Sequence, residues 1–178
     1  MLVKEFEAGT HAAAAFLLQD TKGSDVGSGA QTTLELMKSH AVFLAENLLR
    51  QGARIELPGL DQNASHGSQH ERLNEIYEAL AGVHASSETE VGARLLGLAG
   101  VFPPGSILFV LLSVADDSLP GAIAALSGRG TMVSPLLYDA KRFDPRVKRR
   151  PAVDPSFIRE LRAVGINPIL MPMEGLGG

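Results

Sequence analysis

Short apolar runs alternate along the chain with longer segments in which apolar residues recur every three or four positions. Residues 107–112 are apolar throughout, which predicts a strand buried on both faces. Within residues 33–49, Leu34 and Met37 are spaced as on one face of a helix. Strands that alternate with helices in this way are typical of a parallel sheet covered by helices.

Glycine and proline mark the ends of these segments; Gly52, for example, stands where a helix should end. The expected strands lie at 12–18, 54–58, 107–112, 131–138 and 166–171, and the expected helices at 33–49, 71–81, 90–101, 119–126 and 155–164. We therefore predict an α/β fold, a Rossmann-like doubly wound, mostly parallel sheet flanked by helices, in a single domain over 1–178.

Composition narrows the functional classes. The chain has 178 residues, 45% of them hydrophobic, which suffices for one sizeable core. Its net charge of −4 argues against nucleic acid as the main partner. The absence of cysteine excludes disulfides, thiolate metal sites and cysteine nucleophiles. No stretch is apolar enough for a leader or a membrane helix, so a cytoplasmic protein is expected.

Residues 139–153 differ from the rest in their density of positive charge. Six basic residues stand between 141 and 150, and Pro151 follows them. This composition predicts an exposed basic connection. Its stretch 146–150 could bind an acidic partner, a phospholipid surface or RNA, but a solvated loop is favoured because no aromatic residues are interleaved in that stretch for base stacking.

Acidic and hydroxyl side chains follow two of the predicted strands. Asp20 and Ser24 come after the first, Asp116 comes after the central one, and Thr89 precedes a helix. In doubly wound sheets, ligands bind at the carboxyl ends of the strands. Carboxylates and hydroxyls form an oxygen set suited to Mg²⁺. The competing interpretation is that these residues only cap helices and close turns.

Several short motifs, in this order, resemble a known family. They are Val-Lys-Glu-Phe-Glu at 3–7, Gln-Asp-Thr-Lys-Gly-Ser at 19–24, Thr-Leu-Glu at 33–35, Leu-Leu-Arg-Gln-Gly at 48–52 and the segment 89–96. Together they resemble the carboxyl-terminal, von Willebrand factor A-like part of the bacterial domain-of-unknown-function fifty-eight family, over most of the chain up to about residue 139. Members of that family commonly carry an amino-terminal part with membrane helices, so the resemblance implies a fragment whose parent is anchored at the inner membrane, or a shortened relative.

The resemblance implies a metal-ion-dependent adhesion site of the pattern Asp-x-Ser-x-Ser with a distant Thr and Asp. Asp20 matches its first position, Ser24 its last, Thr89 the threonine and Asp116, or its neighbour Asp117, the final aspartate.

Lys22 stands where the motif has its middle serine, so the site is degenerate. A protonated lysine cannot bind a cation, but its ammonium could take the cation's place by pairing with Asp20 or Asp116.

The first functional hypothesis is a protein-interaction module without enzymatic activity, which the resemblance links to a MoxR-type AAA ATPase. The alternative is a Mg²⁺-dependent hydrolase or phosphotransfer enzyme that uses Asp20 and Asp116. A third is a small-molecule-binding Rossmann-like domain, which an apolar pocket at the carboxyl edge would favour.

Overall fold

The computed structural model describes residues 13–60 and 67–174, so the motif at 3–7 lies outside the described part. The chain folds into a five-stranded parallel sheet of order β4-β1-β5-β6-β7. The strands are β1 (Ala13–Leu18), β4 (Arg54–Glu56), β5 (Ile107–Leu112), β6 (Met132–Leu137) and β7 (Ile169–Leu170). The predicted α/β, Rossmann-like fold class is confirmed.

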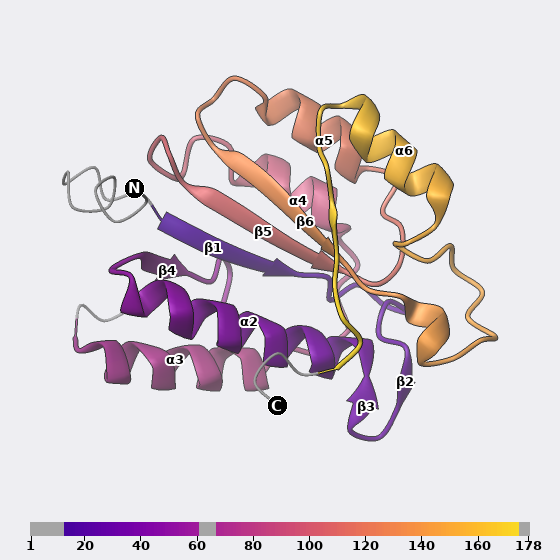
Figure 1. Ribbon diagram of the computed structural model, residues 1–178, viewed down its shortest axis with the longest axis horizontal. Helices are drawn as coiled ribbons and strands as arrows, with labels where there is room; N and C mark the ends of the chain where they lie inside the picture. The colour runs from indigo at the N-terminus through magenta and orange to yellow at the C-terminus, as the bar shows by residue number, and fades with distance from the viewer. Residues whose placement is uncertain (1–12, 61–66, 175–178) are drawn as a thin grey trace.

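Helices cover both faces of the sheet. They are α2 (Thr33–Arg50), α3 (Gln69–Ala81), α4 (Val91–Gly97), α5 (Leu119–Leu126), α6 (Pro155–Ala163) and the short 3₁₀ helix η1 (Ala140–Arg142). In Figure 1, α2 and α3 lie on one side of the sheet and α4, α5 and α6 on the other. None of the helices in the described residues is long and apolar enough to cross a bilayer.

The two cores follow from the alternation of side chains along β1. Phe16 and Leu18 pack with α2 and α3, whereas Ala15 and Leu17 pack with α4, α5 and α6. All six residues of β1 are therefore buried, as expected for a strand covered on both faces.

The chain runs from β1 outward to β4 and then returns to β5 on the other side of β1. The strand order thus reverses between β1 and β5, and the loops that follow these two strands diverge at that point. This is where doubly wound folds place their ligands.

Three elements differ from expectation. The helix predicted over 90–101 stops at Gly97, and Gly100 adopts a positive φ of 78° in the turn beyond it. The strand predicted over 166–171 is reduced to β7 at the sheet edge. Within the predicted loop after β1, β2 (Gly27–Ser28) and β3 (Gln31–Thr32) form a short antiparallel hairpin.

The basic connection predicted over 139–153 is only partly exposed. Four of its cationic side chains face solvent: Lys141, Arg142, Arg146 and Lys148. Ala140, Pro151 and Ala152 are buried, because one end of the connection packs with Val26 and Val114 and the other packs against the end of β5. The connection is therefore exposed at these four cations and covered at its two ends.

A buried polar pair joins α2 to the end of β6 and to the carboxyl-terminal segment. The His40 Nε2 lies 2.7 Å from the carbonyl of Glu174, which can only accept, so Nε2 carries the hydrogen. Nδ1 then accepts from the Tyr138 hydroxyl at 3.0 Å. Both side chains are fully buried.

Stability is expected to fall in mild acid because of His40. Burial lowers the pKa of His40 below its usual 6.5, although its bond to Glu174 opposes this. In mild acid the unfolded chain therefore binds more protons than the folded protein does. The contribution of neutral His40 to the free energy of unfolding is complete above the unfolded pKa, and it is lost as the pH falls through the lowered native pKa.

Urea unfolding between about pH 7.5 and pH 5 measures this effect. His40→Gln is expected to remove part of the pH dependence, whereas the exposed control His70→Gln retains it. Identical pH profiles for wild type and His40→Gln would contradict the assignment.

Candidate contact edge at the carboxyl ends of the strands

The ends of β1 and β5 are held together by Gln19. Its side-chain oxygen accepts from the backbone N–H groups of Ser113 and Val114 at 3.0 and 3.1 Å, and its amide donates to the Val114 carbonyl at 3.0 Å. Gln19 is 1% exposed. This buried amide fixes the relative position of the two loops that carry the predicted site residues.

Ser24 is turned toward its own loop. Its hydroxyl donates to the Thr21 carbonyl at 2.7 Å, and its carbonyl accepts from the Ser113 hydroxyl at 2.7 Å. The side chain is buried. Ser24 therefore folds the loop after β1 back over the end of β5.

Asp20 forms an ion pair with Arg94 of α4. One carboxylate oxygen accepts from Arg94 Nη1 at 2.9 Å, and the same nitrogen donates to the Leu18 carbonyl at 3.1 Å. About a fifth of each side chain is exposed. A guanidinium therefore supplies positive charge beside Asp20.

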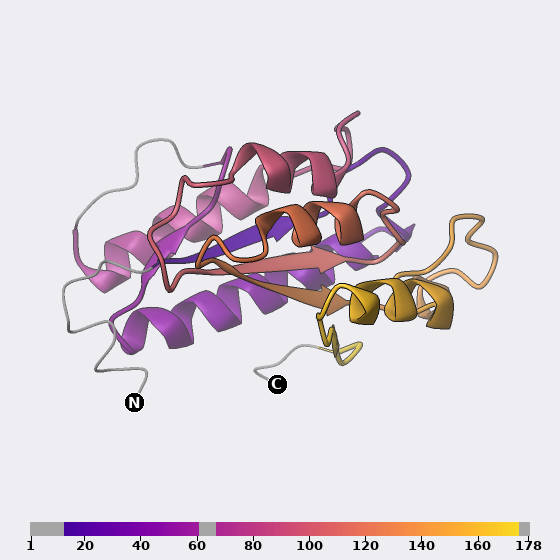
Figure 2. The same cartoon turned by 90° about the horizontal axis from the view of Figure 1, so that it is seen from above.

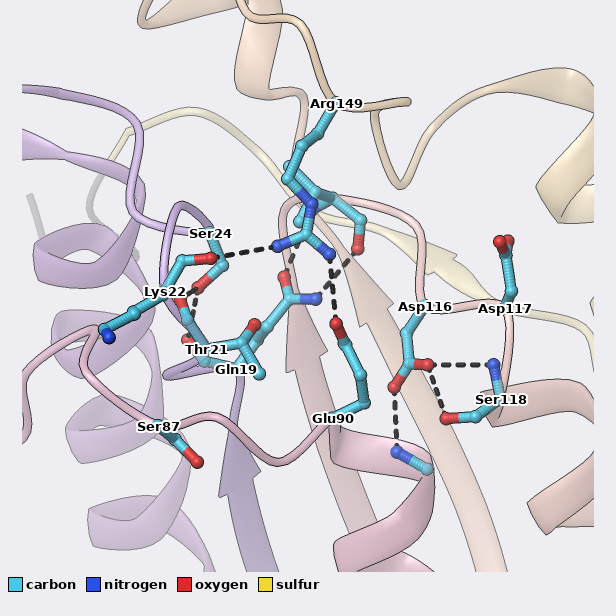
Figure 3. Close-up of polar contacts among 12 residues, drawn as sticks. Gln19, Thr21, Lys22, Ser24, Ser87, Glu90, Asp116, Asp117, Ser118 and Arg149 are labelled. Atoms are coloured by element: carbon cyan, nitrogen blue, oxygen red, sulfur yellow. Dashed lines mark hydrogen bonds and ion pairs between the residues drawn. The ribbon is translucent and has the colours of Figure 1, made fainter.

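Asp116 accepts hydrogen bonds at both carboxylate oxygens. One oxygen accepts from the backbone N–H of Gly92 at 2.8 Å. The other accepts from the backbone N–H and the hydroxyl of Ser118 at 2.9 and 2.6 Å. The residue is 1% exposed, so it joins the first turns of α4 and α5 from inside the protein (Figure 3).

Lys22 and Thr89 lie on the outer side of the edge. The Lys22 ammonium pairs with Glu88, both side chains being largely exposed, and not with Asp20 or Asp116. Thr89 is also exposed, and its backbone N–H donates to the Ser87 hydroxyl at 3.1 Å. The segment around Ser87 joins the edge through a parallel bridge to Thr21.

Arg149 was not predicted to lie at this edge, yet its side chain points into the centre of the loops in Figure 3. Its guanidinium donates to the Lys22 carbonyl and to Glu90 Oε1, both at 3.3 Å. The second oxygen of Glu90 and the Thr21 hydroxyl are buried, with no partner among the described residues. The signal that could have located Arg149 is topological: the basic connection starts at the carboxyl end of β6.

Arg150 anchors the carboxyl-terminal end of the basic connection. Its guanidinium donates to Asp117 at 2.6 Å and to Glu160 of α6 at 3.0 Å. Its carbonyl accepts from the Ala115 N–H at 2.7 Å, and Ala152 N–H donates to Ser113 at 2.9 Å. Residues 150–152 are thus hydrogen-bonded to the loop that follows β5.

The four predicted ligands, Asp20, Ser24, Thr89 and Asp116, all belong to loops that meet at this edge. Their side chains, however, do not converge on a common point, because they bond to different local partners. Within 13–60 and 67–174, no group of three or more His, Asp or Glu side chains is arranged to hold a metal ion. Arg94 and Arg149 supply the positive charge that balances Asp20 and Glu90.

No family model matches the sequence, and no curated protein is similar enough to it to count as a relative.

Proposed function

We propose that this chain is a protein-interaction module that presents the carboxyl edge of its sheet to a partner, and that arginine side chains rather than a divalent cation hold this edge in shape. The proposal is carried by the hydrogen bonds and the ion pair that the two key carboxylates already make. Asp116 already accepts hydrogen bonds at both oxygens, and Asp20 is paired with Arg94. A cation beside Asp20 would be repelled by the Arg94 guanidinium, and a cation at Asp116 would have to reach a carboxylate that is only 1% exposed.

The same observation weighs against the alternative, a Mg²⁺-dependent hydrolase or phosphotransfer enzyme using Asp20 and Asp116. Such an enzyme would need both carboxylates turned toward a metal or substrate. The Asp116 side chain instead lies buried between the starts of two helices. By the family resemblance, the partner is a MoxR-type AAA ATPase.

Calorimetric titration of Mg²⁺, Mn²⁺ and Ca²⁺ into the protein tests the cation-independent edge. We expect no saturable binding by wild type, because the carboxylates already have partners. The same is expected of Lys22→Ser, because Lys22 pairs with Glu88 and is not what holds a cation away. Binding by wild type that is lost in Asp20→Ala would overturn this expectation.

Binding to a purified MoxR-type ATPase from the same organism tests the contact edge. Lys22→Glu reverses an exposed charge at this edge and is expected to weaken binding about tenfold. Arg129→Glu makes the same change in the exposed turn between α5 and β6, at the opposite edge of the sheet, and serves as the matched control. Equal binding by both variants, or no binding by wild type, would contradict the proposal.

A further inference from the structure

The basic connection, which begins with η1 and leads to α6, projects beyond the sheet at its carboxyl edge in both views (Figures 1 and 2). We call its four exposed cationic side chains, Lys141, Arg142, Arg146 and Lys148, the basic platform. We infer that the basic platform docks an acidic segment of the partner protein; this inference rests on the proposed function and specifies the chemistry of the partner.

The charge of this segment is opposite to that of the rest of the chain. Residues 139–150 hold six basic and two acidic side chains, a net charge of +4, whereas the whole chain has −4 and the remainder therefore −8. Asp144 is occupied by Arg146, at 2.9 Å from its backbone N–H and 3.2 Å from its Nε. Within the described part of the chain, Lys141 and Lys148 have no ion-pair partner. They leave positive charge available to another molecule.

The platform rests on a small core of its own. Ala140 is buried with Val26 and Val114, and Phe143 and Val147 pack against this cluster. Backbone hydrogen bonds close the turns above it, from Phe143 to Ala140 at 3.0 Å and from Val147 to Asp144 at 3.1 Å. A packed base holds the backbone beneath the cations in place before a partner arrives, which reduces the entropy lost on binding.

A cavity of about 730 Å³ adjoins the platform. Arg142 and Phe143 line one side of it, and the β2–β3 hairpin and the first turns of α2 line the other. Its lining is mixed polar and apolar, with Gln31 and Ser39 beside Leu36. The lining also includes Glu35 and Glu174, so uncharged side chains of a docked peptide can enter this depression while its own carboxylates face the cations.

An acidic protein segment fits these features better than RNA or a membrane does. The exposed side chains between residues 141 and 148 are four cations and Pro145, and the single aromatic ring among them, Phe143, is half-buried, whereas single-stranded nucleic acids are bound by stacking successive bases on several rings. Phe143, the aromatic side chain of this loop, packs against its base. An anionic bilayer would also meet the −8 carried by the rest of the chain.

The test is fluorescence anisotropy with a labelled peptide of alternating Glu and Ser, with oligouridylate and phosphatidylserine vesicles as competing probes. Lys141→Ala with Lys148→Ala is expected to weaken peptide binding about tenfold. Arg129→Ala with Arg162→Ala removes the same charge from exposed sites outside the connection and is expected to change it less than about twofold.

Equal effects of the two double variants would overturn the inference, as would tighter binding of the RNA or the vesicles than of the peptide. The ATPase assay separates the two proposals. An ATPase that binds wild type and Lys141→Ala/Lys148→Ala equally leaves the proposed function standing and overturns the docking inference. Peptide binding that depends on the platform, without ATPase binding, supports the docking inference and overturns the ATPase assignment.

Discussion

Replacing Asp116 with alanine is expected to lower the free energy of unfolding by about 3 kcal/mol, because it leaves buried donors without an acceptor. Asp116 accepts from the N–H groups of Gly92 and Ser118 and from the Ser118 hydroxyl. At 1% exposure, water cannot readily replace it. Equilibrium urea unfolding measures the loss, with the slope m checked for two-state behaviour.

The neighbouring residue provides a matched control. Asp117 pairs with Arg150 but its side chain is 88% exposed, so Asp117→Ala should cost less than about 1 kcal/mol. Asp116→Asn should also be destabilising, because one oxygen becomes an NH₂ group that faces another donor. If Asp116→Ala and Asp117→Ala were equally stable, the carboxylate of Asp116 would not hold the two helices together.

Replacing Gly92 with alanine is expected to cost about 3 kcal/mol through overpacking. A Cβ at this position would lie 2.3 Å from the Ser118 hydroxyl oxygen and 2.6 Å from the Ser118 carbonyl carbon. The second contact is with backbone, so a side-chain rotation cannot relieve it. The first turn of α4 would have to move away from α5, which also lengthens the hydrogen bond from Gly92 to Asp116.

Gly97→Ala, in the same helix, separates this clash from helix propensity. Apart from its two chain neighbours and the backbone of its own helix, no described residue has an atom within 4 Å of the position where its Cβ would stand. This variant should therefore raise stability by up to about 1 kcal/mol, the usual advantage of alanine over glycine in a helix. Thermal unfolding of the two variants tests the contrast, and a Gly92→Ala protein as stable as Gly97→Ala would contradict the close approach.

The fold could be predicted because the local patterns agree with the global arrangement. β1 and β5 are apolar along their length, as strands covered on both faces must be, and α2 has a clear helical period. The misplaced end of α4 and the missed hairpin depend on glycine conformations, such as the φ of 122° at Gly27. Composition alone does not reveal which glycines adopt such angles.

The site was predictable in location but not in detail. The sequence places Asp20 and Asp116 after parallel strands, so their arrival at one edge follows from topology. Whether a carboxylate contacts a cation or an N–H group depends on long-range packing. Asp116, for example, accepts a hydrogen bond from the N–H of Gly92, 24 residues earlier. The roles of Arg94 and Arg149 likewise depend on contacts that span the fold.

The hydrogen bonds at residues 150–152 determine how mechanical load would travel through this domain. The connection that carries the basic platform is joined at one end to β6, through η1, and is hydrogen-bonded at the other end to the loop that follows β5. A pull on the platform is therefore shared between two adjacent inner strands instead of unravelling a single peripheral loop. A partner that exerts force at this surface would therefore load β5 and β6 together.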